Sequence, residues 1–251
     1  MNPILCYEHP FSRSMRVFVR FEQLVAQFNT LLDGDSALAH QTALLTLSEL
    51  FQLASHLDLK AEVFREADHL RQSWDHAPPM EDLPALRAAL EAEVARVGEL
   101  RGQLNAHLKN HAFFTAVRQR ATMPGGINSF DLPVYHYWLH QPADQRRAEL
   151  AEWIAPYRQL YRAVAQILTV VRACCRSEEC TAEQGYFAKV FQNGGTPQLL
   201  QVHVAPDLPC YPEVSAGKQR CIIRFFEPTT LRDRPGQTGR DVPFRLVYCG
   251  L

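Results

Sequence analysis

The sequence lacks any apolar run of the roughly 18–20 residues that a membrane-spanning helix requires. Its first residues, MNPILCYEHPF, contain no basic segment followed by a long apolar core, so we expect no secretory signal. Lysine and arginine together number 26, against 27 aspartates and glutamates, which gives a formal net charge of −1. A near-neutral chain has no global attraction to nucleic acid or to an anionic membrane. These absences predict a cytoplasmic protein that does not insert into the membrane.

The short motifs of several common enzyme classes are also missing. The Pro-Gly-Gly sequence at 124–126 has neither the length nor the Lys-Ser/Thr ending of a phosphate-binding loop. No G-x-S-x-G elbow occurs, so a hydrolase serine has no local support. The seven cysteines are irregularly spaced, and Cys174, Cys175 and Cys180 lack the two C-x-x-C pairs of a zinc site. We therefore predict no catalytic residues and no enzymatic activity.

Two histidine pairs keep one alternative open. His107/His111 and His136/His140 each have the i, i+4 spacing that places two imidazoles on one helix face. Neither first histidine is followed by the glutamate of a zinc-protease motif. A metal-dependent enzyme using one of these pairs is an alternative that metal analysis would test. Our prediction is that the protein requires no metal and no organic cofactor.

What the chain does have is a long helical region rich in apolar residues. Hydrophobic residues make up 47% of its 251 residues, enough for one large core or two smaller ones. Residues 13–183 have helical periodicity. The first helix has one apolar stripe, formed by Phe18, Phe21, Val25, Phe28 and Leu32. The last helix is expected from about Asp144 to Arg176, and Pro156 should kink or split it.

A heptad pattern runs between Leu83 and Leu108. Apolar residues recur every seven positions, with others at the intermediate steps: Leu83, Leu90, Val97 and Leu104, then Leu86, Val94, Leu100 and Leu108. This is nearly four heptads of a coiled-coil seam, opened by Pro84 in its first turn. The pattern fits a long helix packed in its own bundle. It also fits a helix that, alone or with a neighbour, forms a subunit interface, and we expect a homodimer.

From Gly185 onward the period changes from helical to alternating. Strands are expected at Tyr186–Phe191, Leu200–Val204, Lys218–Glu227 and Val242–Tyr248, with a turn at Asn193-Gly194-Gly195. The extended residues Ile4–Glu8 could return to this sheet as an extra strand. The sequence therefore predicts an α+β fold, with an all-helical bundle domain at 1–183 followed by an antiparallel β-sheet domain at 184–251.

The strand KQRCIIRFFE carries the most informative basic residues. Strand alternation separates its side chains into two faces. One face has Lys218, Arg220, Ile222, Arg224 and Phe226, and the core face has Cys221, Ile223 and Phe225. The arginines could simply be solvated. The apolar residues between them instead favour a groove that holds a peptide through charged and apolar contacts. A small nucleic-acid-binding module is a further alternative, but the basic patch is small.

A second candidate docking surface is the corner at 118–140, RQRATMPGGINSFDLPVYHYWLH. Pro124 ends one helix, and the glycines at 125–126 permit a sharp change of direction. Ser129 or Asp131 can cap the next helix, in whose first turn Pro133 fits. Local geometry does not require the cationic and titratable residues gathered at this corner: Arg118, Arg120, His136 and His140. Such a cluster suggests a docking surface rather than a catalytic centre.

The whole chain resembles the ZapD family of accessory proteins of the bacterial division ring. The motifs that carry the resemblance are YEHP with MR and R-x-E at 7–22, LSEL at 47–50, VRQR…PGG…SFDLP…H-x-W-L-H at 117–140, NGG at 193–195 and YP…S-x-x-K-x-R…IRF at 211–225. Each fragment is weak alone, but the combination is specific. One position departs from the family, since His56 stands where an arginine is expected, and histidine carries less charge than arginine near neutral pH.

The resemblance implies a non-enzymatic homodimer formed mainly through the helical domain. It also implies binding to the C-terminal tail of FtsZ, the tubulin-like division GTPase, with cross-linking of FtsZ filaments at the midcell ring. Family residues that bear on this interaction correspond to Arg20 and His136 in the helical domain, and to Arg220 and Arg224 in the β-domain. Together with the two surfaces above, the expected FtsZ-binding residues are Arg20, Arg118, Arg120, His136, His140, Lys218, Arg220 and Arg224.

Overall fold

A computed structural model describes residues 4–76, 80–124, 126–191, 197–217, 220–228 and 236–250. The chain divides into two compact units. The helical unit comprises Val17–His69 and Asp82–Ile167, and the β-unit comprises Met1–Arg16, Leu70–Glu81 and Leu168–Leu251. Helices occupy 13–173 and antiparallel strands occupy 175–249, so the expected α+β fold class is confirmed.

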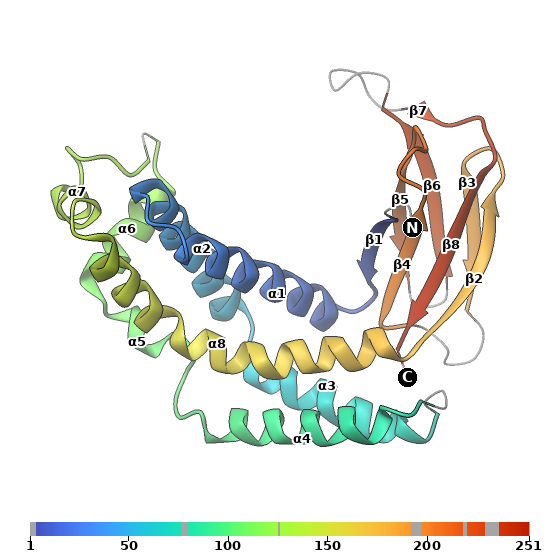
Figure 1. Ribbon diagram of the computed structural model, residues 1–251, viewed down its shortest axis with the longest axis horizontal. Helices are drawn as coiled ribbons and strands as arrows, with labels where there is room; N and C mark the ends of the chain where they lie inside the picture. The colour runs from blue at the N-terminus through green and yellow to red at the C-terminus, as the bar shows by residue number, and fades with distance from the viewer. Residues whose placement is uncertain are drawn as a thin grey trace. The chain divides into compact units, whose positions relative to one another are not determined.

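The helices are labelled in Figure 1. They are α1 Arg13–Leu32, α2 Ala37–His56, α3 Leu59–Ser73, the 3-10 turn η1 Trp74–His76, α4 Leu83–Glu99, α5 Ala106–Lys109, α6 Ala112–Ala121, α7 Pro133–Leu139 and α8 Ala143–Ala173. Within the described part of the chain, no helix combines the length and the apolarity needed to cross a membrane.

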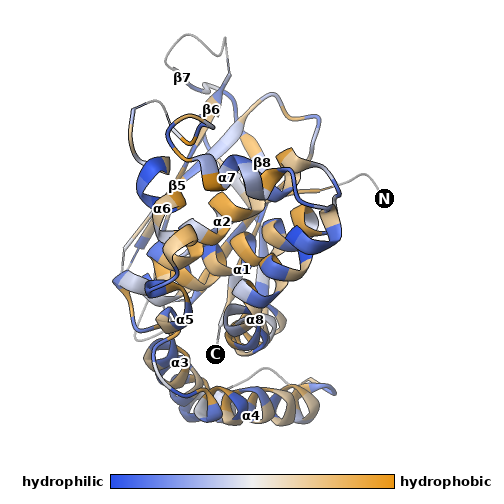
Figure 2. Ribbon diagram, turned by 90° about the vertical axis from the view of Figure 1, so that its left-hand side faces the viewer, coloured by the Kyte–Doolittle hydropathy of each residue, from blue (hydrophilic) through white to orange (hydrophobic). Residues whose placement is uncertain are grey.

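The apolar stripe predicted on α1 is confirmed, because Phe18, Phe21, Val25, Phe28 and Leu32 are all buried. In Figure 2 the ribbons of α1 and α2 are coloured largely by hydrophobic residues, whereas hydrophilic residues recur along α4. Ser36 starts α2, since its side chain accepts a hydrogen bond from the backbone N–H of Ala39 at 3.0 Å. The helical unit thus has a core built from helix faces of the expected period.

A buried arginine ties three parts of the helical unit together. Arg146, near the start of α8, is only 5% exposed. Its Nε donates to Nδ1 of His40 at 3.0 Å, and its terminal nitrogens donate to the carbonyls of Leu139, Gln141 and Asp35. A buried charge is tolerated when its donors are satisfied in this way. Arg146 therefore connects α8 to α2 and to the chain that follows α7.

The prediction of one continuous helix along the heptad pattern of 83–108 is wrong. Leu90, Val94, Val97 and Leu108 are buried, but α4 ends at Glu99 and the pattern passes through an irregular segment before α5. Gly102 has φ +70°, which a helix does not permit. The side chain of Lys60 donates to the carbonyls of Leu100 and Gly102, both at 2.6 Å, and satisfies them outside a helix.

The expected cap of α7 also needs correction. Neither Ser129 nor Asp131 caps α7: Leu132 is the N-cap and makes no side-chain cap hydrogen bond. The Asp131 carboxylate instead accepts a hydrogen bond from the side-chain amide of Asn128 at 2.9 Å. This local hydrogen bond competes with capping of the helix. Pro133 does occupy the first turn, as predicted. Pro156 lies inside α8 without splitting it.

The strands of the β-unit are β1 Leu5–Pro10, β2 Cys175–Ala182, β3 Tyr186–Val190, β4 Leu199–Val204, β5 Tyr211–Ala216, β6 Arg220–Glu227, β7 Gly236–Gln237 and β8 Val242–Cys249. They form two antiparallel sheets. The first has the order β1-β4-β8-β2, and the second has the order β3-β6-β5, with β7 paired to β6. The N-terminal β1 pairs with β4 along its length, from Leu5 opposite Val204 to Pro10 opposite Leu199.

The region 175–182, expected to be helical, is a strand instead. β2 pairs with β8 from Cys175 opposite Cys249 to Ala182 opposite Val242. Its sequence, CRSEECTA, is mostly exposed, and only its last residue is buried, so no apolar alternation marked it as a strand. β5 and β7 were not predicted either. The turn expected at 193–195 lies outside the described residues.

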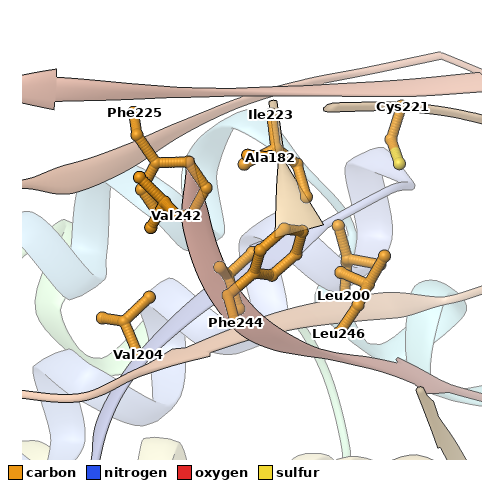
Figure 3. Packing of buried hydrophobic residues seen from close by; sticks show 10 residues of the cluster. Ala182, Leu200, Val204, Cys221, Ile223, Phe225, Val242, Phe244 and Leu246 are labelled. Carbon is orange, nitrogen blue, oxygen red and sulfur yellow. The ribbon is translucent and has the colours of Figure 1, made fainter. Parts of the chain in front are cut away.

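The core of the β-unit lies between its two sheets. Figure 3 shows Cys221, Ile223 and Phe225 of β6 pointing toward Leu200 of β4 and Phe244 and Leu246 of β8. The rings of Phe225 and Phe244 have centroids 5.3 Å apart. The predicted core face of β6 is therefore confirmed, and its opposite face points out of the β-unit.

Candidate functional site

The strongest candidate site is the outer face of the β3-β6-β5 sheet. Along β6, residues alternate between buried and partly or fully exposed positions. Arg220 and Arg224 are exposed, while Ile222 and Phe226 between and beside them are partly buried. The central position of β6 in its sheet, with β3 on one side and β5 on the other, holds these side chains on a rigid support.

Neighbouring strands complete this face with apolar side chains. In the β3–β6 register, Tyr186 is opposite Arg224 and Val190 is opposite Arg220. Directly opposite side chains lie on the same face of a sheet, with Cβ atoms about 4.5–5.5 Å apart. Tyr186 is 43% exposed and Val190 is 67% exposed. Each arginine therefore has an exposed apolar side chain beside it. We call this surface, Tyr186, Val190, Arg220, Ile222, Arg224 and Phe226, the outer basic face.

The two arginines are available to a ligand. The side chain of neither Arg220 nor Arg224 forms a hydrogen bond or an ion pair with any other residue in the described part of the chain. Elsewhere in the β-unit, Arg245 pairs with Glu179 at 2.6 Å. One acid is close in register, since Glu213 of β5 is opposite Arg224. The face thus presents two cations and one anion among apolar groups. Lys218, expected on the same face, lies outside the described residues.

The neighbouring basic residue Lys189 is not part of this face. Its Nζ donates to both carboxylate oxygens of Glu178 at 2.6 Å, and Tyr248 donates to the same carboxylate. Burial alone would raise the pKa of Glu178, but these hydrogen bonds outweigh it and lower the pKa. The network links β2, β3 and β8, so it ties the strand bearing Tyr186 and Val190 to the other sheet.

Two cysteines of the β-unit, Cys221 and Cys249, are buried. Burial raises the pKa of Cys221 to about 11 and that of Cys249 to about 12. Both therefore remain protonated thiols near neutral pH, and the thiolate is the reactive form. Cys221 belongs to the core between the sheets, and Cys249 is buried as well.

In the helical unit, the expected site residues fall into separate places. Arg20 on α1 forms an ion pair with Glu49 on α2 at 2.5 Å, and both side chains are about half exposed. Arg120 on α6 approaches Asp131 at 3.6 Å. Exposed ion pairs of this kind add little stability. Both arginines can therefore exchange their intramolecular partner for a ligand at small cost.

Arg118 lies at a cleft of about 590 Å³ formed by the end of α2, the start of α3 and the segment before α5. Its guanidinium carbon is 4.8 Å from the ring centroid of Phe51. Its Nε is buried and has no hydrogen-bond partner among the described residues. His56 and Lys109 also line the cleft. An unpaired buried donor is costly to the free protein, so a ligand acceptor reaching Arg118 would gain from satisfying it.

His136 and His140 are exposed neighbours on α7. Their ring centroids are 4.3 Å apart, and Nδ1 of His140 lies 2.8 Å from the carbonyl oxygen of His136. Arg118 interacts with Phe51 and Arg120 with Asp131, and among the described residues no hydrogen bond or ion pair joins either arginine to this histidine pair. Arg118, Arg120 and the histidine pair thus each have local partners of their own at the corner 118–140.

The other histidine pair supports the helices around it. Nε2 of His107 is 2.7 Å from the carbonyl oxygen of Trp153. His111 caps α6, because its Nδ1 accepts from the backbone N–H of Phe114 at 3.2 Å. Among the described residues, no group of three or more histidine, cysteine, aspartate or glutamate side chains is placed to hold a metal ion.

Sequence reasoning missed Tyr186 and Val190 as members of the candidate site. Alternation along 186–190 already places both on one strand face, together with Ala188. What the sequence could not supply is the register that sets them opposite Arg224 and Arg220. It also missed an aromatic groove between α6, α7 and α8, because its residues come from separate helices.

Comparison with known proteins gives a consistent result. The family model for ZapD, described as a cell division protein, matches residues 19–224. A protein of Aromatoleum aromaticum named cell division protein ZapD is 34% identical over 255 residues, an alignment that covers 100% of this chain and 99% of that protein.

Proposed function

Because this chain belongs to the ZapD family of cell division proteins, we propose that it binds the C-terminal tail of FtsZ and cross-links FtsZ filaments at the midcell division ring. The observation that carries the proposal is the outer basic face of the β-unit. There, Arg220 and Arg224 have no ionic partner among the described residues and lie beside exposed apolar side chains. A peptide with both acidic and apolar residues fits such a surface.

The chemistry of arginine supports this choice of ligand. A guanidinium offers forked donors to a carboxylate or to peptide carbonyls, in a geometry that lysine does not reproduce. An ion pair fully open to water contributes only about 0.2–1 kcal/mol. Contacts with Tyr186, Val190 and Phe226 would shield part of the pair from water, so its contribution would be larger. Ion pairing and apolar burial would then both contribute to the binding of the peptide.

The helical unit would supply a second contact region. Arg118 has a buried donor without a partner among the described residues, Arg20 and Arg120 are held only by weak ion pairs, and His136 and His140 are exposed. Arg20, Arg120, His136 and His140 can turn to an acidic ligand without loss of a core contact, and Arg118 can accept one where it lies. We place them as auxiliary contacts, because the two arginines of the outer basic face have no intramolecular partner in the described chain to give up.

Cross-linking requires at least two tail-binding sites on one particle, and a homodimer formed through the helical unit would provide them. Two linked sites that engage repeated tails on two filaments raise the overall avidity by roughly 10²–10⁴ over one contact. In this proposal the protein is a cytoplasmic, non-enzymatic adaptor that needs no cofactor and does not bind nucleic acid.

The proposal is tested by low-speed sedimentation of FtsZ polymers with and without the purified protein. Filament bundles pellet at speeds that leave single filaments in solution, so added protein should move FtsZ into the pellet. Light scattering on the protein alone should give twice its chain mass of 28.6 kDa. Soluble single filaments in the presence of a folded dimer would refute the proposed activity, and a strictly monomeric mass would remove the basis for cross-linking.

A further inference from the structure

The helical unit has an aromatic groove that the proposed tail contacts do not use. It lies between α6, α7 and α8 and encloses about 450 Å³. Three of its aromatic rings pack against one another: the Phe113 centroid is 5.5 Å from that of Trp138 and 5.8 Å from that of Trp153. Tyr137, which is 68% exposed, and Val134, which is 48% exposed, form its outer wall.

The groove is lined by acidic side chains and, among the described lining residues, by no lysine or arginine. The acidic residues are Glu149 and Glu152 of α8. The Trp138 indole N–H donates to Oε2 of Glu149 at 2.6 Å. This hydrogen bond holds the carboxylate against the aromatic wall. The Glu149 side chain is ordered by a neutral donor, and no cation among the described lining residues balances its charge.

The histidines at the inner end have structural partners. His107 contacts the carbonyl oxygen of Trp153, and His111 packs against the Trp153 ring with centroids 5.0 Å apart. Both therefore help to position Trp153. The result is a preformed wall of aromatic rings with carboxylates at its edge.

We propose that this groove, the aromatic–acidic groove, binds a peptide segment of a partner protein that presents an arginine or lysine side chain next to apolar residues. An aromatic face attracts a cation within about 6 Å of its centroid. The ring open to such a cation is that of Tyr137, and the buried Trp138 and Trp153 line the groove with it. A carboxylate beside the same site neutralises the cation, and the apolar neighbours of the cation would cover Val134 and Tyr137. This ligand is opposite in charge to the one that suits the outer basic face. The inference therefore goes beyond the proposed function.

Intrinsic fluorescence gives a direct test, because two of the three tryptophans of the chain line the groove. The full-length protein is titrated with a capped peptide of sequence Leu-Arg-Leu-Lys-Leu. A second titration uses the acidic counterpart Leu-Glu-Leu-Glu-Leu. The expected result is a saturable change in emission with the basic peptide and none with the acidic one.

Two variants locate the binding. Tyr137→Ala removes an exposed ring. The double variant Glu149→Gln/Glu152→Gln removes both charges, while the amide oxygen introduced at position 149 can still accept the Trp138 hydrogen bond. Each should weaken the basic peptide at least tenfold with an unchanged circular dichroism spectrum. Matched controls are Leu38→Ala, another exposed apolar residue, and Glu81→Gln, an exposed acid outside the groove. Both controls should bind like the wild type.

Any of the following results would overturn the inference. The first is the absence of saturable binding of the basic peptide to the wild-type protein at millimolar concentration. The second is equal binding of the two peptides, or undiminished binding by the folded variants. The third is a halved mass of Tyr137→Ala in light scattering, which would assign the groove to an interface between two copies of this chain.

Discussion

Arg224 of β6 lies directly opposite Tyr186 of β3, and both side chains are exposed on the same face of the sheet. The pair joins a guanidinium without an intramolecular ionic partner in the described chain to an aromatic ring that is 43% exposed. Arg220 has the same relation to Val190 further along the strand. Neither arginine contributes to the core, whose side of β6 is formed by Cys221, Ile223 and Phe225.

Replacing both arginines should therefore separate binding from folding. In Arg220→Ala/Arg224→Ala we expect bundling of FtsZ to be lost, with binding weakened by about 2 kcal/mol or more, roughly thirtyfold. The melting temperature should change by less than about 2 °C, since exposed substitutions rarely exceed 0.5 kcal/mol. Low-speed sedimentation and thermal melting measure the two effects.

The matched control for this variant is Arg176→Ala/Arg245→Ala, which removes two exposed arginines from the other sheet of the β-unit. This control should bundle FtsZ as the wild type does. Binding by the wild type should also weaken as salt rises, because screening acts on exposed charges. Full bundling by the folded Arg220→Ala/Arg224→Ala variant would contradict this placement and would indicate that FtsZ binds at Arg20 and the corner at 118–140 instead.

His136→Ala tests the auxiliary contact in the helical unit. The His136 side chain is exposed, so its removal leaves no cavity and the melting temperature should stay within about 2 °C of the wild type. Binding to FtsZ should weaken by a smaller factor than in the double arginine variant. If the purified variant binds FtsZ with wild-type affinity, His136 has no place in the interface.

Gly126 tests the backbone of the same corner. It has φ +65°, and its N–H donates to the carbonyl of Met123 at 3.0 Å. No described atom lies within 4 Å of a Cβ added there, so a substitution acts through backbone conformation alone. Gly126→Val should cost roughly 1–3 kcal/mol, whereas Gly126→Asn, which tolerates this conformation, should cost less. Chemical denaturation measures both, and equal stabilities would contradict the assigned turn. Gly125, the other glycine of this turn, lies outside the described residues.

His40 predicts a specific pH dependence of stability. Burial, and then the neighbouring charge of Arg146, lower the pKa of His40 below its ordinary value of 6.5. The unfolded chain then takes up a proton more readily than the folded protein does. The stability linked to His40 is therefore fully present above about pH 6.5 and is lost as the pH falls below that value.

The measurement is the free energy of unfolding at a series of pH values from neutral to mildly acidic. His9 and His203 also have lowered pKa values, in both cases mainly through burial, so some pH dependence remains without His40. In His40→Gln, where the amide oxygen can still accept from Arg146, the loss of stability on acidification should be smaller than in the wild type. An unchanged or steeper loss would show that His40 is not the group responsible.

Strand and helix periods predict the parts of the fold in which one face is clearly apolar. The stripe on α1 and the two faces of β6 are of this kind, and the structure confirms both. The sequence of β2 did not indicate a strand, because its residues are mostly exposed and show no apolar alternation. The long heptad of 83–108 is misleading because the same leucine spacing continues past the helix end, where Gly102 adopts positive φ.

The candidate site could be predicted only in part, for a different reason. Alternation places Arg220 and Arg224 on an outer face, but their apolar neighbours depend on the pairing of β3 with β6. Arg146 shows the same limit in the helical unit. It lies in a polar stretch of sequence, yet it is buried because carbonyls from distant segments satisfy it. Tertiary placement of this kind is not encoded in a local pattern.

The most direct test of the account is high-speed co-sedimentation of the purified protein with assembled FtsZ, in parallel with FtsZ that lacks its C-terminal tail. Both forms of FtsZ must pellet as polymers, so the measured quantity is the protein carried into the pellet. The account predicts saturable co-sedimentation with full-length FtsZ and none above background with the tail-less form. Equal co-sedimentation with the two forms, or none with either, would contradict it.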